Sequence, residues 1–365
     1  MPLNDSNKIN AADGNTKIRV FLSFLLHLTI IVSLFIPAVY GDIYKWKDKD
    51  GNWRYSDQPP PESQEDSWWE EKGRVIRTNP EKSVEKKQLP PTFPETRTTA
   101  SGEGMLWKIE VQGPSPSYIL GTIHSEDPRV LNFSSSLTKA FDKAETFIME
   151  VVLNESALFQ TTASMMLTEG RTLESIVGEP LFNRVVNAMA GYGLIKPAVN
   201  YMKPWAVMSM LSVPIPKTGE FMDVVLYQKA ISQDKNVLGL ETVQDQLNVF
   251  DNMPMEDQIA LLEDTLNYLD QYPDLFEKMI QTYLDGDLEG VAELGKTAMN
   301  PKNQALTEKL LKRLNDNRNI TMINQMLPHL MAGNAFIAVG ALHLPGPNGL
   351  LNLLAEKGFK VTAVK

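Results

Sequence analysis

Two short motifs of the same form, a glycine followed three residues later by a histidine, constrain this fold most. They are Gly121-Thr-Ile-His124 and Gly340-Ala-Leu-His343, and they hold two of the four histidines in the chain. Each follows an apolar, β-branched run, residues 118–120 and 335–339, which predicts a buried strand. Each histidine then falls at the carboxyl end of a strand, the edge where ligands bind in open α/β sheets. The two motifs are therefore predicted to form halves of one site.

The residues around the first motif predict a repeatable structural unit. Residues 105–111 read as a first strand that pairs with residues 118–121 across a tight turn. A helix is expected over residues 135–144, followed by a strand over 146–152 that carries Glu150 among apolar neighbours. Strand, Gly-x-x-His turn, helix and strand in this order are typical of a right-handed crossover.

The C-terminal residues repeat this order of elements. A helix is predicted over residues 347–357 and a strand over 359–364. The intervening residues 154–333 have an almost entirely helical pattern, which resembles a cap over the crevice. The predicted fold is α/β: a central mixed or parallel sheet built from two related strand–GxxH–helix–strand halves, with a large helical insertion and a small β-hairpin module in front.

The N-terminal residues 1–41 predict export. Lys17 and Arg19 precede a largely apolar run over residues 20–39, the pattern of a signal peptide. The run is also long enough to span a bilayer, so a retained membrane anchor is the alternative. In either case we expect a protein that works in the periplasm, free or anchored in the cytoplasmic membrane and facing the periplasm.

Two further segments separate this run from the large domain. Residues 42–69 alternate polar and apolar side chains around an Asp-Gly turn, which predicts a β-hairpin module. Residues 70–104 are rich in Lys, Glu, Pro, Thr and Ser, a composition typical of a flexible linker. The large domain is expected over residues 105–365.

Composition excludes several classes of function. The chain has 35 basic and 45 acidic residues and a formal net charge of −10, which argues against nucleic-acid binding. It contains no cysteine, so thiol nucleophiles, thiolate metal sites and disulfides are excluded. A metal ion would have to be bound by His, Asp and Glu side chains.

Several motifs occur together in an order that resembles a known family. They are Gly121-Thr-Ile-His124, Glu150, Lys203-Pro-Trp205, Gly239-Leu-Glu-Thr242, Arg318-Asn319 and Gly340-Ala-Leu-His343-Leu-Pro-Gly346. From about residue 103 to the end, the chain resembles the TraB/GumN family, bacterial relatives of the TIKI metalloproteases. The resemblance implies an α/β domain with helical insertions and, for the animal relatives, divalent-metal-dependent proteolysis. The hairpin module resembles a small bacterial envelope module of unknown function.

The chemistry of three residues suits a metal site. His124, His343 and Glu150 supply two imidazoles and one carboxylate, a common ligand set for zinc that also suits manganese or cobalt. Such a site leaves a position for a water molecule that the ion activates. The alternative for each residue is a hydrogen-bonded structural role. A glutamate among apolar residues requires a cation or donors nearby.

Two other charged residues are candidates for catalysis. Glu241 is predicted to be a further ligand or the general base, with a helix N-cap as the alternative. Arg318 is predicted to stabilise an oxyanion or clamp a carboxylate, with a helix-surface salt bridge as the alternative. Asp223, near a helix start, reads as a capping residue. Lys203-Pro-Trp205 reads as a helix entry with Trp205 packed beneath it.

Three classes of function remain. A metal-dependent hydrolase of the cell envelope, most consistent with a peptidase acting on a peptide or protein substrate, requires His124 and His343 to converge. A protein that binds or sequesters a peptide or haem without catalysis requires a crevice but no water-activating base. A structural envelope protein requires no shared pocket.

Overall fold

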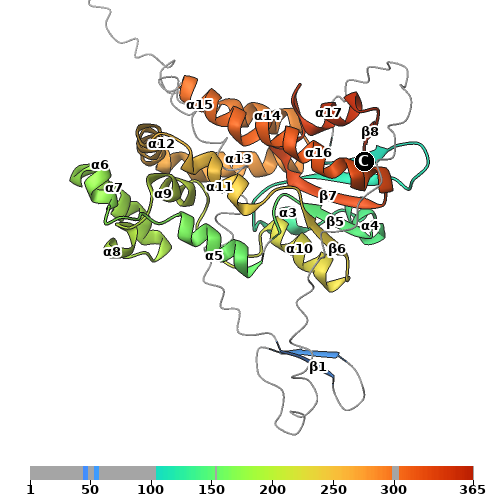
Figure 1. The fold of residues 1–365 in the computed structure, drawn as a ribbon, viewed down its shortest axis with the longest axis horizontal. Coiled ribbons are helices and arrows are strands. Elements are labelled where there is room, and N and C mark those ends of the chain that lie inside the picture. The colour runs from blue at the N-terminus through green and yellow to red at the C-terminus, as the bar shows by residue number, and fades with distance from the viewer. Residues whose placement is uncertain (1–43, 48–52, 57–103, 153, 298–303, 365) are drawn as a thin grey trace, which may run out of the picture. The chain divides into compact units, whose positions relative to one another are not determined.

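The structure, a computed structural model, describes residues 44–47, 53–56, 104–152, 154–297 and 304–364. These residues fall in two units that are described separately, a β-hairpin and a large α/β domain (Figure 1). The predicted export segment and nearly all of the predicted linker lie outside the described residues. No helix within the described ranges is both long and apolar enough to cross a membrane.

The small unit contains the predicted hairpin. Strands β1 (Tyr44–Lys47) and β2 (Trp53–Ser56) pair in antiparallel fashion, with Lys47 opposite Trp53. The pairing agrees with the alternating pattern and places the Asp-Gly turn between the two strands.

The large domain is built on one mixed sheet of six strands in the order β6-β5-β7-β4-β3-β8. Their bounds are β3 Leu106–Glu110, β4 Ser117–Thr122, β5 Thr146–Met149, β6 Asn236–Gly239, β7 Ala335–Gly340 and β8 Lys360–Ala363. β7 lies near the centre and all six of its residues are buried, which explains its unbroken apolar sequence. The predicted α/β class and mixed sheet are confirmed.

Strand register brings the two Gly-x-x-His motifs to the same edge of the sheet. β3 and β4 form the predicted antiparallel hairpin. β4 and β7 are adjacent and parallel, with Gly121 opposite Val339 and Thr122 opposite Gly340. Because parallel neighbours end at the same side of a sheet, His124 and His343 both follow the carboxyl edge.

The two halves share an order of elements but differ in space. β7 inserts between β4 and β5, so the first crossover skips one strand. After β7 the chain returns through α17 (Leu350–Glu356) to β8, which pairs antiparallel with β3 at the far edge. The strand predicted over 146–152 ends at Met149, so Glu150 is the first residue beyond β5 and does not lie inside it.

One group of helices packs with the sheet around a first hydrophobic core. Ser134 caps α4 by accepting a hydrogen bond from the Leu137 N–H, and Leu137 and Phe141 of that helix enter this core. The group comprises α3 Pro128–Leu131, α4 Ser135–Lys143, α10 Met222–Ser232, α13 Tyr272–Leu284, α14 Leu288–Thr297, α16 Asn317–Ala332 and α17.

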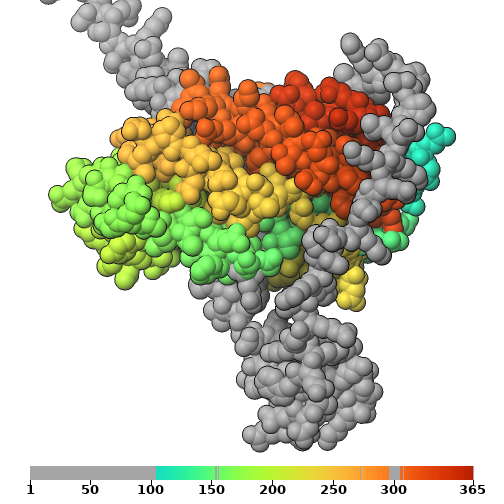
Figure 2. Space-filling view, viewed as in Figure 1, coloured from blue at the N-terminus to red at the C-terminus, as the bar shows by residue number. Residues whose placement is uncertain are grey.

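The remaining helices form a second core. They are α5 Glu155–Ser164, α6 Leu173–Val177, α7 Glu179–Met189, α8 Lys196–Val199, α9 Pro204–Leu211, α11 Val243–Asp251, α12 Met255–Tyr268 and α15 Gln304–Leu311. The predicted insertion over residues 154–333 is largely helical, as expected, but it also contains β6 and contributes helices to both cores. In Figures 1 and 2, α6, α7 and α8 (green) occupy one end of the domain and α17 (red) the other.

The long helical stretch before β7 is interrupted. A π-helical turn, η6 (Lys312–Asp316), joins α15 to α16, and the Asn317 N–H donates to the Lys312 carbonyl. Such turns insert one extra residue into a helix and are frequent at functional sites. The helix α12 ends at Tyr268, and a 3₁₀ turn, η4 (Leu269–Gln271), follows it.

Candidate functional site at the carboxyl edge of the sheet

Two glutamates follow adjacent parallel strands. β5 and β6 pair with Met149 opposite Gly239. Beyond the strand ends the pairing continues, because the Glu241 N–H donates to the Glu150 carbonyl at 2.8 Å. Both carboxylates are buried. The sheet therefore fixes Glu150 and Glu241 side by side at the edge from which the two histidines also leave.

Arg318, the second residue of α16, binds both carboxylates. Its Nη2 donates to Glu150 Oε2 at 2.5 Å and to Glu241 Oε2 at 2.6 Å, and its Nε donates to Glu241 Oε1 at 3.0 Å. Its Nη1 donates to the Leu314 carbonyl in the π-helical turn at 3.2 Å. Arg318 is buried, so these are charge-assisted bonds in a low-dielectric setting.

Neutral donors complete the environment of Glu150. Gln246 Nε2 donates to Glu150 Oε2 at 3.0 Å, and the Gly340 N–H donates to Oε1 at 2.7 Å. Glu150 therefore receives hydrogen bonds from three separate elements: α11, α16 and the end of β7. This meets the requirement that a buried carboxylate be paired and hydrogen-bonded.

The two carboxylates differ in acidity. Burial raises the pKa of Glu150, but the Arg318 guanidinium, His343 and the Gly340 N–H outweigh burial and hold this pKa at about 2. Burial raises the pKa of Glu241, and the neighbouring charge of Glu150 adds to this, so its pKa lies above the ordinary value despite Arg318. One guanidinium faces two carboxylates, so with both ionised this part of the site has one negative charge in excess.

His343 is held in one orientation by Asn319. It lies at the end of η7 (Ala341–His343), and its Nδ1 is 2.7 Å from Asn319 Oδ1. Asn319 Nδ2 donates to the carbonyls of His343 and Asn348 at 3.2 and 2.8 Å, which leaves Oδ1 as the acceptor. Nδ1 therefore carries the proton, and in the neutral ring Nε2 presents its lone pair.

That second nitrogen faces the carboxylate network. His343 Nε2 is 3.7 Å from Glu150 Oε1, and the imidazole is fully buried. A histidine anchored through Nδ1 with Nε2 directed at a carboxylate is the usual arrangement of a metal ligand or a proton-transfer group.

The first motif has different surroundings. His124 is fully buried and stacks on Phe221, with ring centroids 3.8 Å apart and planes inclined by 10°. Its Nδ1 lies 3.9 Å from Asp223 Oδ2, while Asp223 Oδ1 accepts from the Thr122 hydroxyl at 2.7 Å. Within the described part of the chain, neither ring nitrogen of His124 nor Asp223 Oδ2 has a hydrogen-bond partner. These are three buried polar atoms available to a ligand.

Gly121 brings the two turns into contact. A Cβ added at Gly121 would lie 2.9 Å from Leu344 Cδ1 and 3.0 Å from Ala341 Cα. Any larger residue would push against the backbone of the second turn. The glycine of the first motif therefore allows the two turns to approach each other closely.

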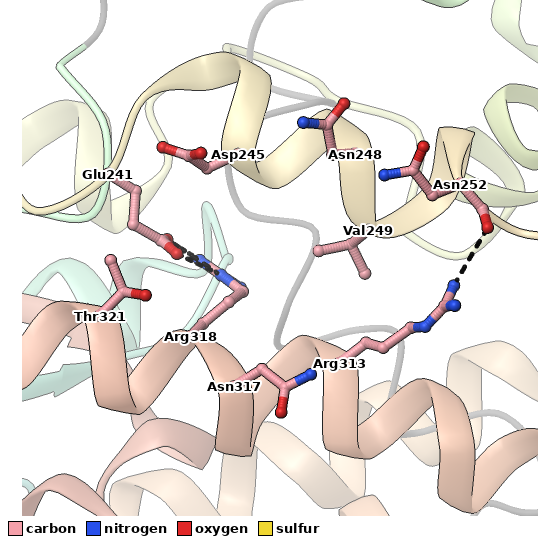
Figure 3. A pocket seen from close by; sticks show the side chains of 9 residues that line it. All are labelled: Glu241, Asp245, Asn248, Val249, Asn252, Arg313, Asn317, Arg318 and Thr321. Atoms are coloured by element: carbon pink, nitrogen blue, oxygen red, sulfur yellow. Dashed lines mark hydrogen bonds and ion pairs between the residues drawn. The ribbon is translucent and has the colours of Figure 1, made fainter.

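A polar groove opens beside this cluster. It has a volume of about 330 Å³ and lies between α11 and the segment formed by η6 and the start of α16 (Figure 3). Glu241 and Arg318 line one end, and Arg313 lines the other. The groove therefore reaches the Glu241–Arg318 ion pair, whereas Glu150 and His343 are not among the residues that line it.

Several structural alternatives raised by the sequence are wrong. The N-cap of α11 is Thr242 and not Glu241. Arg318 is buried, so it does not form a helix-surface salt bridge. Asp223 does not cap α10, whose N-cap is Phe221; it accepts a hydrogen bond from Thr122 instead.

The reading of Lys203-Pro-Trp205 is confirmed. Pro204 is the first residue of α9, and Trp205 is fully buried. Lys203 Nζ and Trp205 Nε1 both donate to Asp251 Oδ1, at 2.7 and 2.8 Å. The motif therefore ties the start of α9 to the end of α11.

Three residues near the site had no functional role assigned from the sequence. Asn319 orients His343, Gln246 bonds to both glutamates, and Asp223 faces His124. The pairing of Asn319 with Arg318 in one family motif was a signal that could have identified it. Gln246 and Asp223 lie on helices of the insertion, and no pattern in the sequence places those helices against the sheet edge.

The predicted ligands fit a divalent ion in chemical type, but they are not gathered as a complete set. His343 Nε2 and Glu150 Oε1 lie near each other, one negative charge is in excess, and His124 has unpartnered nitrogens. Imidazole nitrogen and carboxylate oxygen suit zinc, manganese or cobalt. Among the described residues, however, no three His, Asp or Glu side chains are arranged closely enough to bind a metal ion.

Comparison with known proteins places this chain in a family. Residues 105–363 match the TraB/PrgY/gumN family, and the chain belongs to it. Residues 30–96 match a domain of unknown function, DUF4124. No solved structure matches the chain.

The similar proteins are distant, and they include both uncharacterized proteins and proteins named metalloproteases. An uncharacterized protein of Treponema pallidum is 24% identical over 278 residues, covering 70% of this chain and 81% of that protein. Metalloprotease TIKI1 of Danio rerio is 23% identical over 313 residues, covering 70% of this chain and 62% of TIKI1. Uncharacterized protein YbaP of Shigella flexneri is 26% identical over 252 residues, covering 67% of this chain and 90% of YbaP. The match thus spans less than two thirds of TIKI1.

Proposed function

We propose that this protein is a divalent-metal-dependent hydrolase that cleaves peptides in the cell envelope. The observation that carries the proposal is the environment of His343. Its Nδ1 is bound by Asn319, and its Nε2 faces Glu150 at 3.7 Å beside a buried carboxylate pair. The similarity to proteins named metalloproteases supports the same chemistry.

In this proposal the residues that would hold the ion are His343 and Glu150, with His124 from the neighbouring strand end. When bound, a divalent ion lowers the pKa of a water molecule so that it can attack a carbonyl. Asn319 and the Gly340 N–H orient the histidine and the glutamate from behind, as partners of metal ligands commonly do.

Glu241 and Arg318 have supporting roles in this proposal. Burial raises the pKa of Glu241, which suits a group that accepts a proton during the reaction. In this structure Arg318 clamps Glu241 and Glu150. Stabilisation of an oxyanion by Arg318 therefore requires that it release one of the two carboxylates.

The test combines metal content with hydrolysis, using the purified full-length protein. Elemental analysis should find about one Mn, Co or Zn ion per chain in the wild type and none in His124→Ala or His343→Ala. Both variants and chelated wild type should lose hydrolysis of a susceptible peptide, and added metal should restore only the wild type. His329→Ala is the matched control, because His329 lies on α16 within the described domain but outside the site.

Absence of metal from the wild type, or full activity in His343→Ala, would exclude this mechanism. A second candidate, a protein that binds a peptide or haem without catalysis, would then take its place. One observation favours that alternative: Arg318 already binds both glutamates, so the carboxylates are compensated in part without a metal ion.

A further inference from the structure

The groove between α11 and the η6–α16 segment is unlike an ordinary helix contact. Packed helices usually bury apolar stripes against each other. Here α11 contributes Asp245, Asn248 and Asn252, and the facing segment contributes Arg313, Asn317 and Thr321, around a space of about 330 Å³. The Asp245 carboxylate lies toward the Glu241 end, where it accepts hydrogen bonds from the Thr242 N–H and hydroxyl. Val249 projects into the middle of this space (Figure 3). Polar side chains therefore surround a single apolar side chain in this groove.

The two ends of the groove differ in charge. Arg318 at one end is neutralised by Glu241, with which it forms three hydrogen bonds. Arg313 at the other end donates to the Asn252 carbonyl at 3.4 Å, and no carboxylate pairs with it in the part of the chain that the structure describes. Arg313 is half-buried. It is thus a partly desolvated guanidinium that lacks a counter-ion, and a carboxylate fits such a group.

The other groups around the groove indicate what carries the carboxylate. The side-chain amides of Asn248, Asn252 and Asn317 each offer donors and an acceptor, which matches the alternating N–H and C=O groups of an extended backbone. No aromatic side chain lines the groove, so a stacking platform for a sugar or nucleobase is absent from this lining. An extended peptide that carries a carboxylate would pair with both the unpaired guanidinium and the side-chain amides of the groove.

We propose that this groove binds an extended peptide through a carboxylate on Arg313 and backbone amides on Asn248, Asn252 and Asn317. This inference rests on the proposed peptide hydrolase and names its substrate class. Arg313 and Arg318 are five positions apart, roughly 7 Å along a helix axis, which equals two or three residues of extended chain. The carboxylate therefore lies two or three residues from the Glu241–Arg318 end.

The test measures binding directly, so it does not depend on catalysis. Full-length His343→Ala protein is titrated into three fluorescein-labelled octapeptide pools, randomised over neutral residues, and fluorescence anisotropy is recorded. The first pool has a central glutamate and an amidated C-terminus. The second has no glutamate but a free terminal carboxylate, and the third has neither. Adding Arg313→Gln to the same protein tests the anchor, and adding Arg171→Gln, an exposed arginine of the insertion, is the matched control.

At least one carboxylate pool should bind about tenfold more tightly than the neutral pool, because a carboxylate–guanidinium bond in a partly desolvated site contributes on the order of 1.4 kcal/mol. Arg313→Gln should abolish the difference, and Arg171→Gln should retain it. Preference for the first pool identifies an acidic side chain as the source, and preference for the second identifies the terminal carboxylate. Arg313→Lys, which keeps the charge, should retain part of the preference.

Equal binding of all three pools, no binding of any pool, or an unchanged preference in Arg313→Gln would overturn the proposal. Thermal unfolding of each variant shows whether the fold is intact. The outcome is separable from that of the proposed hydrolase. If peptide binding depends on Arg313 but the wild-type protein has no hydrolytic activity, the groove proposal holds and the hydrolase proposal fails. If the wild-type protein hydrolyses peptides and Arg313→Gln does not change that activity, the hydrolase proposal holds and the groove proposal fails.

Discussion

The two Gly-x-x-His turns have the same form and opposite surroundings. His343 belongs to a polar network in which Asn319, Glu150 and Arg318 hold one another. His124 is held by packing, stacked on Phe221, and its nitrogens have no hydrogen-bond partner among the described residues. The motif therefore determines the position of the imidazole at the sheet edge. The helices that pack against each turn determine which groups the imidazole contacts.

The surroundings of the two histidines differ because different parts of the chain pack against each turn. Glu150, Glu241 and Arg318 lie at the seam between the two cores: Met149 belongs to the sheet core and Val151 to the core of the insertion. The second turn faces this seam. The first turn is covered by α10 and α13, where the Tyr283 hydroxyl donates to the Gly121 carbonyl. The network therefore orients His343 by hydrogen bonds, whereas packing alone orients His124.

The largest effect is expected from breaking the network at the second turn. Arg318→Ala leaves two buried carboxylates without their cation, which costs about 3 to 5 kcal/mol in the free energy of unfolding. Urea denaturation measures this loss. Arg129→Ala is the control: Arg129 also pairs with two carboxylates, Asp127 and Glu277, but at an exposed site, where such pairs contribute up to about 1 kcal/mol. Equal losses in the two variants would contradict the network's role.

A smaller effect is expected where the two turns touch. Gly121→Ala places a methyl group against Leu344 and the Ala341 backbone, and such overpacking typically costs about 1 to 3 kcal/mol. The variant should also shift the ring resonances of His343, measured by NMR, because η7 must move. Gly170→Ala probes a positive-φ glycine with nothing nearby, so its cost should come from backbone strain alone and leave His343 unaffected.

The next effect is the pH dependence of stability, which separates the two carboxylates. The pKa of Glu150 is depressed from 4.5 to about 2, so its stabilisation is present above pH 4.5 and is lost as pH falls toward 2. The pKa of Glu241 is raised, so protonation of Glu241 favours the folded state as pH falls through its folded value. Because the two carboxylates change the free energy of unfolding in opposite directions as pH falls, the wild-type protein should show only a modest net dependence of stability on pH.

Urea denaturation at several pH values should separate the two contributions. Glu150→Gln should remove the loss of stability that the wild type shows as pH falls toward 2. Glu241→Gln should remove the gain in stability that the wild type shows as pH falls through the folded-state pKa of Glu241. Matching pH profiles in both variants would mean that the two carboxylates share one environment.

The smallest effect is expected at the first turn. Asp223→Asn keeps the acceptor for the Thr122 hydroxyl and changes only the atom that lies 3.9 Å from His124. The free energy of unfolding should therefore change by less than about 1 kcal/mol. A loss of several kcal/mol would show that His124 and Asp223 form a strong ion pair, and the contrast between the two turns would fail.

The sequence predicts the parts of this molecule that depend on local pattern. The apolar run of β7 and the Gly-x-x-His turns were sufficient to place both histidines at the carboxyl edge, since parallel strand ends share a side. Pro204 at the start of α9 was predicted because proline suits the first turn of a helix. Each of these follows from residues close together in the chain.

Partners that meet through tertiary packing were not predictable in the same way. Glu150 and Glu241 were both candidates, but their shared contact with Arg318 depends on the insertion folding back over the sheet edge. The position of β8 at the far edge, antiparallel to β3, depends on competition among strands that no single segment encodes. The roles of Asp223 and Gln246 were missed for the same reason.

The π-helical turn has a consequence for how this site can change in evolution. In an α-helix each residue advances the side chain by about 100°, so one extra residue rotates everything beyond it by that amount. Arg318 and Asn319 lie just after Lys312–Asp316, and each faces its own partners. Deleting one residue of that turn would direct both side chains elsewhere without altering either of them. Within the family, a single gap at this position would therefore separate members that retain the network from members that have lost it, even where the arginine and asparagine are still present.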